Sequence, residues 1–166
     1  VDPDAEVTLE ANPGTFEAEK FRGLREAGIN RLSLGVQSFD DARLAAIGRV
    51  HGADEARRAL DMALATFPTV NADLMYALPG QSLEGALADV SEAIERGAPH
   101  VSAYHLTLEP DTHFHRFPPQ LPPEDAAYAW GRIAYEGARR LVPEAHRWYA
   151  LADGSRLASN PASLLE

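Results

Sequence analysis

The sequence of 166 residues contains no cysteine. Disulfide bonds, thiolate nucleophiles and cysteine-ligated iron–sulfur clusters therefore cannot be built from these residues. This absence restricts the functional hypotheses more than any other feature of the composition, because a redox centre held by thiolates would need ligands from elsewhere.

Basic residues are also few. Lys and Arg number 15 against 25 Asp and Glu, which gives a net charge of −10. This excess argues against a nucleic-acid partner or an anionic membrane surface. No apolar run approaches the roughly 20 residues that span a bilayer, and the acidic start at 1–6 does not resemble a signal peptide. We therefore expect a cytoplasmic protein, and the missing initial Met leads us to expect a piece of a longer chain.

What remains is the composition of an ordinary globular domain, with 45% hydrophobic and 24% charged residues. Strand-like apolar segments alternate with amphipathic helical segments four times, at roughly 30 residues per unit. The patterns predict strands at 7–9, 31–36, 70–78 and 100–108, and helices at 17–27, 41–47, 53–66, 83–96 and 124–141. We expect a loop at 111–123 and a weakly ordered tail without assigned function at 142–166.

A strand–helix repeat of this kind predicts an α/β fold with a parallel sheet. Four right-handed units give a partial parallel (βα) barrel, and a doubly wound sheet is the alternative that periodicity leaves open. Polar residues stand at three successive strand ends, namely Glu10, Gln37 and Asp73. They favour the barrel, because a barrel directs all its strand ends toward one point. We therefore expect these side chains to converge on one polar ligand.

Five sequence blocks carry a more specific signal. They are EANPG (10–14), AGINRLSLGVQSF (27–39), IGRVH (47–51), NADLMYALPGQS (71–82) and HVSAYHLTLEP (100–110). In this order and spacing the blocks resemble the radical SAM proteins of the oxygen-independent coproporphyrinogen III oxidase group. The segment 104–110 and the proline-rich loop after it resemble the haem chaperone branch more than the oxidase. The resemblance covers residues 5–141.

The resemblance implies a partial (βα)6 barrel of which this chain carries strands three to six. In such proteins a CxxxCxxC loop holds a [4Fe–4S] cluster that binds and reductively cleaves S-adenosylmethionine (SAM). That loop and a glycine-rich strand end would precede residue 1, and a C-terminal domain would follow. We therefore expect 1–141 to be a partial radical SAM barrel and 142–166 to be a divergent tail.

The resemblance also assigns SAM contacts to five positions, which are Glu10, Gln37, Arg49, Asp73 and, through its backbone, Thr107. The chemistry is suitable, since carboxylates accept from ribose hydroxyls or an ammonium group and an arginine binds a carboxylate in a bidentate way. An amide can both donate and accept.

Each assignment has a structural alternative. The Asp73 carboxylate could pair only within the protein, and the Glu10 carboxylate could accept from the turn at 12–14. The Gln37 amide could tie two strand ends together, and Arg49 could be an exposed surface residue.

The functional expectation is a segment of a haem-chaperone-like or coproporphyrinogen-oxidase-like radical SAM protein of haem or porphyrin metabolism. SAM would be its ligand, haem or porphyrin would be a partner of the intact parent, and the chain alone would be inactive. One alternative is a non-catalytic α/β module that binds a nucleoside or another metabolite. A metal-dependent barrel hydrolase built around His113 and His115 is a second alternative, but these residues fall in a predicted loop, so we expect no metal site.

Overall fold

A computed structural model describes residues 2, 5–15, 18–141 and 147–151. Its centre is one parallel sheet with the strand order β1-β2-β3-β4-β5. The strands are β1 (Thr8–Ala11), β2 (Arg31–Gln37), β3 (Thr69–Tyr76), β4 (His100–His105) and β5 (Arg147–Leu151). The helices are the 3-10 turn η1 (Pro13–Thr15), α1 (Ala18–Glu26), α2 (Asp41–Ala46), α3 (Ala53–Thr66), α4 (Leu83–Glu95), α5 (His113–Arg116) and α6 (Glu124–Leu141).

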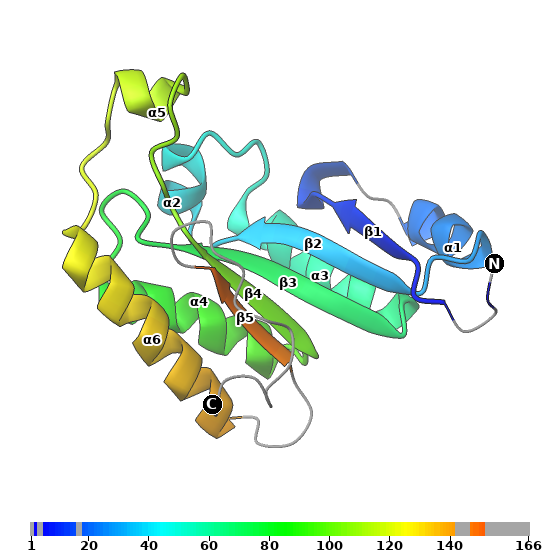
Figure 1. Cartoon of the computed structure of the whole chain (residues 1–166). Coiled ribbons are helices and arrows are strands. Elements are labelled where there is room, and N and C mark those ends of the chain that lie inside the picture. The colour runs from blue at the N-terminus through cyan, green and yellow to red at the C-terminus, as the bar shows by residue number, and fades with distance from the viewer. Residues whose placement is uncertain (1, 3–4, 16–17, 142–146, 152–166) are drawn as a thin grey trace.

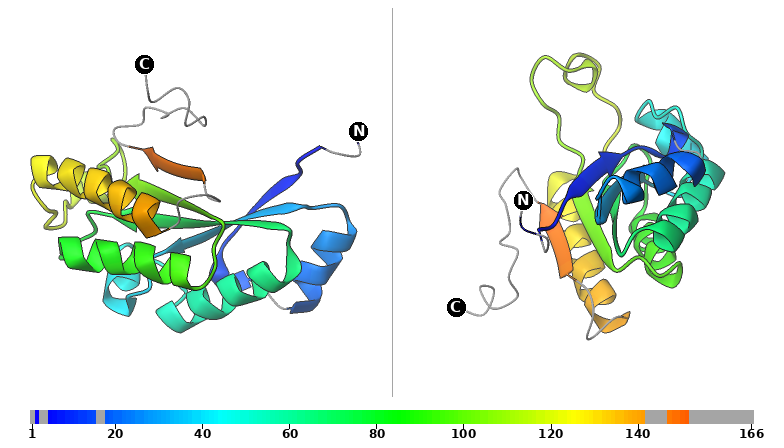
Figure 2. Two further views of the ribbon diagram at one scale, coloured as in Figure 1. Left: turned by 90° about the horizontal axis from the view of Figure 1, so that it is seen from below. Right: turned by 90° about the vertical axis from the view of Figure 1, so that its right-hand side faces the viewer.

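The order of the strands decides between the two predicted architectures. Sequential neighbours pair throughout the sheet, whereas a doubly wound sheet reverses its strand order near the middle. The longer helices α1, α3, α4 and α6 lie on one side of the sheet, which curves away from them (Figures 1 and 2). The prediction of a partial barrel is therefore confirmed, and the alternative of a doubly wound sheet is wrong.

Strand β2 shows why the two faces of the sheet differ. Leu32, Leu34 and Val36 are fully buried in the core, and they alternate with the polar or small residues Arg31, Ser33 and Gly35 on the opposite face. Leu32, Leu34 and Val36 pack against the helices, and Arg31, Ser33 and Gly35 lie on the concave face of the sheet.

Small side chains bring the helices close to the sheet. The buried face of α3 is made of Ala53, Ala56, Ala59, Leu60 and Ala63. At the other end of this core, the ring of Phe21 from α1 meets the ring of Phe67 edge to face, with centroids 5.5 Å apart.

Helix starts follow the expected capping chemistry. The Asp40 carboxylate accepts from the backbone N–H of Arg43 at 2.9 Å, and the Ser82 hydroxyl accepts from that of Gly85 at 3.2 Å. The helices predicted at 53–66 and 124–141 have the observed bounds of α3 and α6.

Three predictions near the C-terminus were wrong. Strand β4 ends at His105 rather than at 108, and the predicted loop contains the short helix α5. Residues Arg147–Leu151, expected to be weakly ordered, form β5 and pair with β4 from His100 to Tyr104. Pairing with a neighbouring strand supplies this order, and local periodicity does not reveal it. The remaining tail residues, 142–146 and 152–166, lie outside the described part of the chain.

Within the described residues, none of the helices combines the length and the apolar character that crossing a membrane would need.

Candidate functional site

A network of polar side chains crosses the concave face of the sheet. We call it the polar row; it consists of Ser33 on β2, Asn71 and Asp73 on β3, and Ser102 on β4. The Ser33 hydroxyl donates to Asp73 Oδ2 at 2.7 Å, and the Asn71 amide donates to Asp73 Oδ1 at 2.7 Å. The Asn71 amide also donates to Ser33 Oγ at 2.9 Å, and the Ser102 hydroxyl donates to Asn71 Oδ1 at 3.2 Å. Three adjacent strands thus hold the Asp73 carboxylate in one position.

The surroundings of Asp73 disfavour its charged form. Burial raises the pKa of the Asp73 carboxyl, the hydrogen bonds from Ser33 and Asn71 lower it, and the Glu10 carboxylate raises it further. Because Asp73 is a half-buried acid close to a second acid, a ligand group that donates hydrogen bonds or carries positive charge would stabilise it.

Glu10 lies on the same face as Asp73. Its Cα stands opposite Ser33 in the register of β1 and β2, and its side chain is exposed. Ser33 in turn bonds to Asp73, so the two carboxylates lie on neighbouring parts of one surface. The expected convergence of Glu10 and Asp73 on one face is therefore observed.

A second polar group lies where β1 and β2 end. Gln37 is buried, has a positive φ of 70°, and stands opposite Leu74, the residue after Asp73. A Cβ placed on Gly35 would lie 2.9 Å from both Gln37 Nε2 and Asn12 Oδ1, so these two amides fill the space beside the Gly35 backbone. Arg49 joins them, because its guanidinium donates to Asn12 Oδ1 at 3.1 Å.

Gln37 and Arg49 thus lie where the strands end, and Glu10 and Asp73 lie on the concave face, Asp73 three residues before the end of β3. Thr107 does not join them through its side chain. Thr107 follows the end of β4, is exposed, and donates its hydroxyl to Glu109 Oε1 at 2.8 Å. The prediction placed it on a strand, and β4 ends two residues before it.

The sequence analysis missed Tyr104. Burial raises the pKa of the Tyr104 hydroxyl, and the carboxylates of Asp73 and Glu10 raise it further. Tyr104 lies two residues after Ser102 on β4, and strand alternation places both on the face that carries Asp73. That alternation was the signal that could have identified it.

Asp89 on α4 is a second buried carboxylate that the sequence analysis missed. Burial, which outweighs its hydrogen bonds, and the nearby charges of Asp40 and Glu92 together raise its pKa to about 6. An acid with a raised pKa in the folded state binds its proton more tightly there than in the unfolded chain. Its contribution to the free energy of unfolding is therefore most favourable below pH 4 and falls as the pH rises to about 6.

We expect about 2 kcal/mol of this contribution to be lost between pH 4.5 and pH 7, and this loss to be absent in Asp89→Asn. The measurement is urea unfolding of the wild type and the variant at pH 4.5 and at pH 7. The difference between their free energies of unfolding should change by this amount between the two pH values. Equal differences at the two pH values would contradict it.

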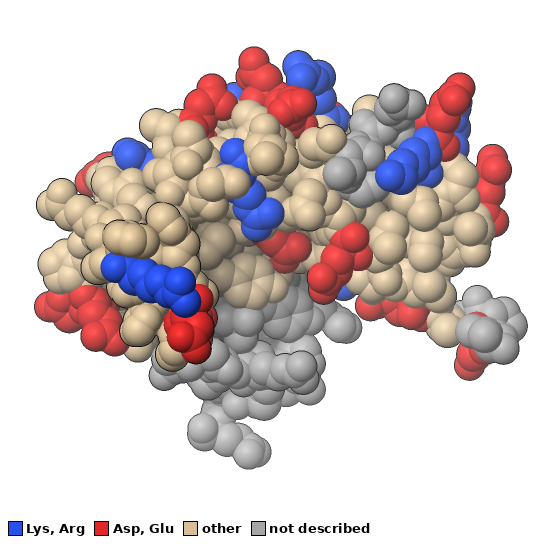
Figure 3. All heavy atoms as spheres, turned by 90° about the horizontal axis from the view of Figure 1, so that it is seen from above, with Lys and Arg blue, Asp and Glu red and all other residues tan. Residues whose placement is uncertain are grey.

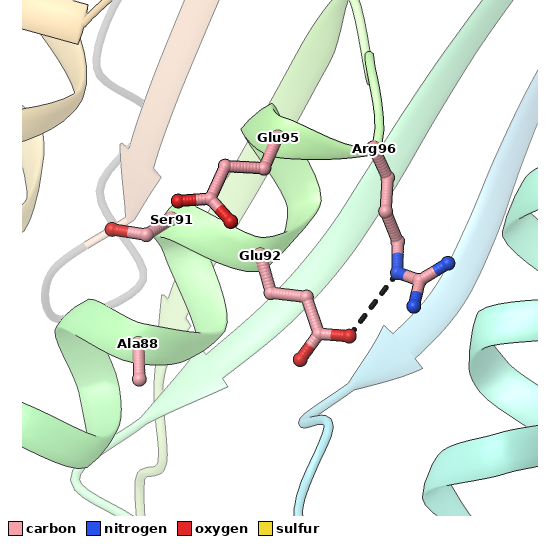
Figure 4. A pocket seen from close by; sticks show the side chains of 5 residues that line it. All are labelled: Ala88, Ser91, Glu92, Glu95 and Arg96. Atoms are coloured by element: carbon pink, nitrogen blue, oxygen red, sulfur yellow. Dashed lines mark hydrogen bonds and ion pairs between the residues drawn. The ribbon is translucent and has the colours of Figure 1, made fainter.

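Away from the polar row, charged side chains of the described residues form ion pairs or lie apart from one another on the surface. Seen from the top of Figure 1, acidic groups predominate and basic groups lie singly among them (Figure 3). A hollow of about 620 Å³ on the surface of α4 is lined by Ala88, Ser91, Glu92, Glu95 and Arg96 (Figure 4). Glu92 there already pairs with Arg57 and Arg96, at 2.6 and 3.1 Å, so this hollow offers no ligand site comparable with the polar row.

Across the described residues, no group of three or more His, Asp and Glu side chains is arranged to hold a metal ion. The hydrolase alternative therefore finds no support in the part of the chain that the structure describes.

Known proteins resemble this chain in sequence and in fold. The Radical SAM superfamily model matches residues 1–92. The chain is 52% identical over 147 residues to "Heme chaperone HemW" of Escherichia coli K12, which covers 88% of this chain and 38% of that protein. It is 44% identical over 110 residues to the mouse mitochondrial "Radical S-adenosyl methionine domain-containing protein 1", covering 66% of this chain and 25% of that protein.

Among solved structures, the fold is similar to that of E. coli coproporphyrinogen III oxidase (HemN), a radical SAM enzyme. The TM-score is 0.74 at 24% identity, over 84% of this chain and 33% of that one. The chain thus spans well under half the length of each of these three proteins.

Proposed function

Because this chain belongs to the radical SAM superfamily, we propose that its strand ends hold S-adenosylmethionine in a HemW-like protein of haem or porphyrin metabolism. The observation that carries the proposal is the Asp73 carboxylate, which hydrogen bonds from Ser33 on β2 and Asn71 on β3 hold on the face that it shares with Glu10. Similarity to proteins named heme chaperone HemW supports the metabolic context.

The residues present fit SAM. The carboxylates of Asp73 and Glu10 would accept hydrogen bonds from ribose hydroxyls or from the ammonium group. Arg49 would bind the ligand carboxylate, and the Gln37 amide would donate or accept beside it. The burial that raises the pKa of Asp73 also strengthens its hydrogen bonds to a ligand, because less water competes for them.

The chain does not itself fit the iron–sulfur cluster, because it has no cysteine. Held next to a reduced cluster in the longer protein, SAM would supply the radical chemistry of the superfamily. The residues of this chain bind SAM, orient it and exclude water from one side of it. Alone, the chain is expected to be inactive, and haem or porphyrin is proposed as a partner of the longer protein.

The test is a titration of SAM into the full-length protein that carries this chain, with its cluster assembled under anaerobic conditions. We expect saturable binding, measured by isothermal titration calorimetry. Absence of saturable binding contradicts the proposal. Equally tight binding to the isolated chain would instead favour the non-catalytic nucleoside-binding module.

Gly35 gives a more local test of the same site. A methyl group in Gly35→Ala would displace the amides of Gln37 and Asn12, which lie 2.9 Å from its Cβ position. We expect SAM affinity to fall about tenfold, equivalent to one lost hydrogen bond. Calorimetric titration of the variant measures the change.

The matched control is Gly23→Ala on α1, where a Cβ meets nothing within 4 Å. It should leave SAM affinity unchanged and stabilise the helix by up to about 1 kcal/mol. Unchanged affinity in Gly35→Ala would show that Gln37 and Asn12 do not contact the ligand.

A further inference from the structure

We infer that Asp89 is a positioning residue that fixes the ends of β2 and β3 relative to each other, so that Gln37 and Asp73 face one ligand. The inference rests on the proposed function for the identity of that ligand. Its physical content, a single carboxylate that joins two neighbouring strand ends, rests on the contacts of Asp89 alone.

The two carboxylate oxygens of Asp89 hold the segment that follows β2. Asp89 Oδ1 accepts from the backbone N–H of Phe39 at 2.7 Å, and Oδ2 accepts from the Ser38 hydroxyl at 2.8 Å. These residues directly follow Gln37, whose positive φ of 70° is unusual for a residue with a side chain. Such a conformation persists only where the surroundings enforce it, and Asp89 supplies that constraint immediately after the strained residue.

The same carboxylate reaches the end of β3 through Gln81. The Gln81 amide donates from Nε2 to Asp89 Oδ2 at 3.2 Å, and its Oε1 accepts from the backbone N–H of Leu78 at 3.2 Å. Leu78 follows Ala77, which also has a positive φ, of 59°. Both strand ends near the candidate site are therefore strained, and both are tied to Asp89.

The arrangement needs a carboxylate. Asp89 and Gln81 are each 6% exposed and Ser38 is fully buried, so water cannot easily replace a missing partner. Asp89 accepts three hydrogen bonds, from Phe39, Ser38 and Gln81. An asparagine at this position would keep one acceptor oxygen and would present an amide nitrogen either to Gln81 Nε2 or to the Phe39 N–H. Asp89→Asn should therefore release at least one strand end with little change in volume.

A purely structural role is the competing explanation, and Val90 provides the control for it. Val90 is the next residue on α4, is 7% exposed and packs in the main core through a side chain that makes no hydrogen bond. Val90→Ala lowers the melting temperature without breaking a hydrogen bond of Asp89. If Asp89 acted only through stability, variants with equal losses of melting temperature would bind SAM equally well.

The experiment measures SAM affinity by calorimetry in the full-length, cluster-containing protein, at a temperature well below every variant's melting point. We expect affinity to fall about tenfold or more in Asp89→Asn and to stay within about twofold of wild type in Val90→Ala. Equal affinities in the two variants overturn the inference. Should Asp89→Asn fail to fold, Gln81→Met, which removes the hydrogen bonds of Gln81 to Asp89 and to Leu78 and leaves those of Asp89 to Ser38 and Phe39, is expected to lower affinity in the same direction.

Amide hydrogen exchange separates this inference from the proposed function. In Asp89→Asn the protection of the Leu78 amide, which bonds to Gln81 and not to Asp89, should fall at least tenfold, whereas Val90→Ala should leave it unchanged after correction for global stability. If wild type does not bind SAM, the proposed function fails, and exchange at Leu78 still decides whether Asp89 joins the strand ends. Unchanged protection of the Leu78 amide in Asp89→Asn overturns the inference even where SAM binds.

Discussion

Replacement of Asp73 by alanine is expected to weaken SAM binding by about 10- to 100-fold, because a hydrogen bond to a charged group contributes about 1.5–3 kcal/mol. The substitution also leaves the Ser33 hydroxyl and one N–H of the Asn71 amide without their acceptor, which loosens the polar row. Calorimetric titration of the full-length protein measures the affinity directly.

Asp54→Ala is the matched control. Asp54 is an exposed acid in the first turn of α3, where it pairs with Arg57 at 3.1 Å. Its removal takes away the same charge from the protein but touches none of the strand ends, so SAM affinity should stay within about twofold of wild type. Equal losses in both variants would mean that net charge, rather than a contact to Asp73, governs binding.

The largest expected effect on stability is that of Phe21→Ala. The Phe21 side chain is fully buried between α1 and the rest of the core, and its ring packs against Phe67. Truncation leaves a cavity that neighbouring helices can only partly close, so we expect a loss of about 3–5 kcal/mol. Urea unfolding monitored by circular dichroism gives the free energy of unfolding.

Phe117→Ala makes the same chemical change at a site that is 67% exposed, just after α5. It should change the free energy of unfolding by no more than about 0.5 kcal/mol. A loss for Phe21→Ala no larger than that for Phe117→Ala would contradict the packing of α1 on the sheet.

Much of the fold could be predicted because the signals are local. Apolar residues at helical spacing mark the face of α3 that is buried, and Ser82 and Asp40 are good helix caps whose hydrogen bonds stay within three residues. Polar residues at strand ends predicted the location of Glu10, Gln37 and Asp73 because the carboxyl ends of parallel strands lie at one edge of the sheet.

What could not be predicted depends on partners far away in the sequence. Asp89 meets the Ser38 hydroxyl 51 residues away, and no local pattern distinguishes it from an exposed acid of an amphipathic helix. Strand β5 is ordered by its pairing with β4, and the contribution of Asn12 depends on Arg49, 37 positions further along. In each case tertiary contact decides what the residue does.

The most direct test of the central claim is an experimental structure of the full-length protein with SAM bound. The account predicts that carboxylate oxygens of Asp73 and Glu10 lie within about 3.2 Å of hydroxyl or ammonium groups of one SAM molecule. A SAM molecule bound elsewhere, with the Asp73 carboxylate still bonded only to Ser33 and Asn71, would contradict it.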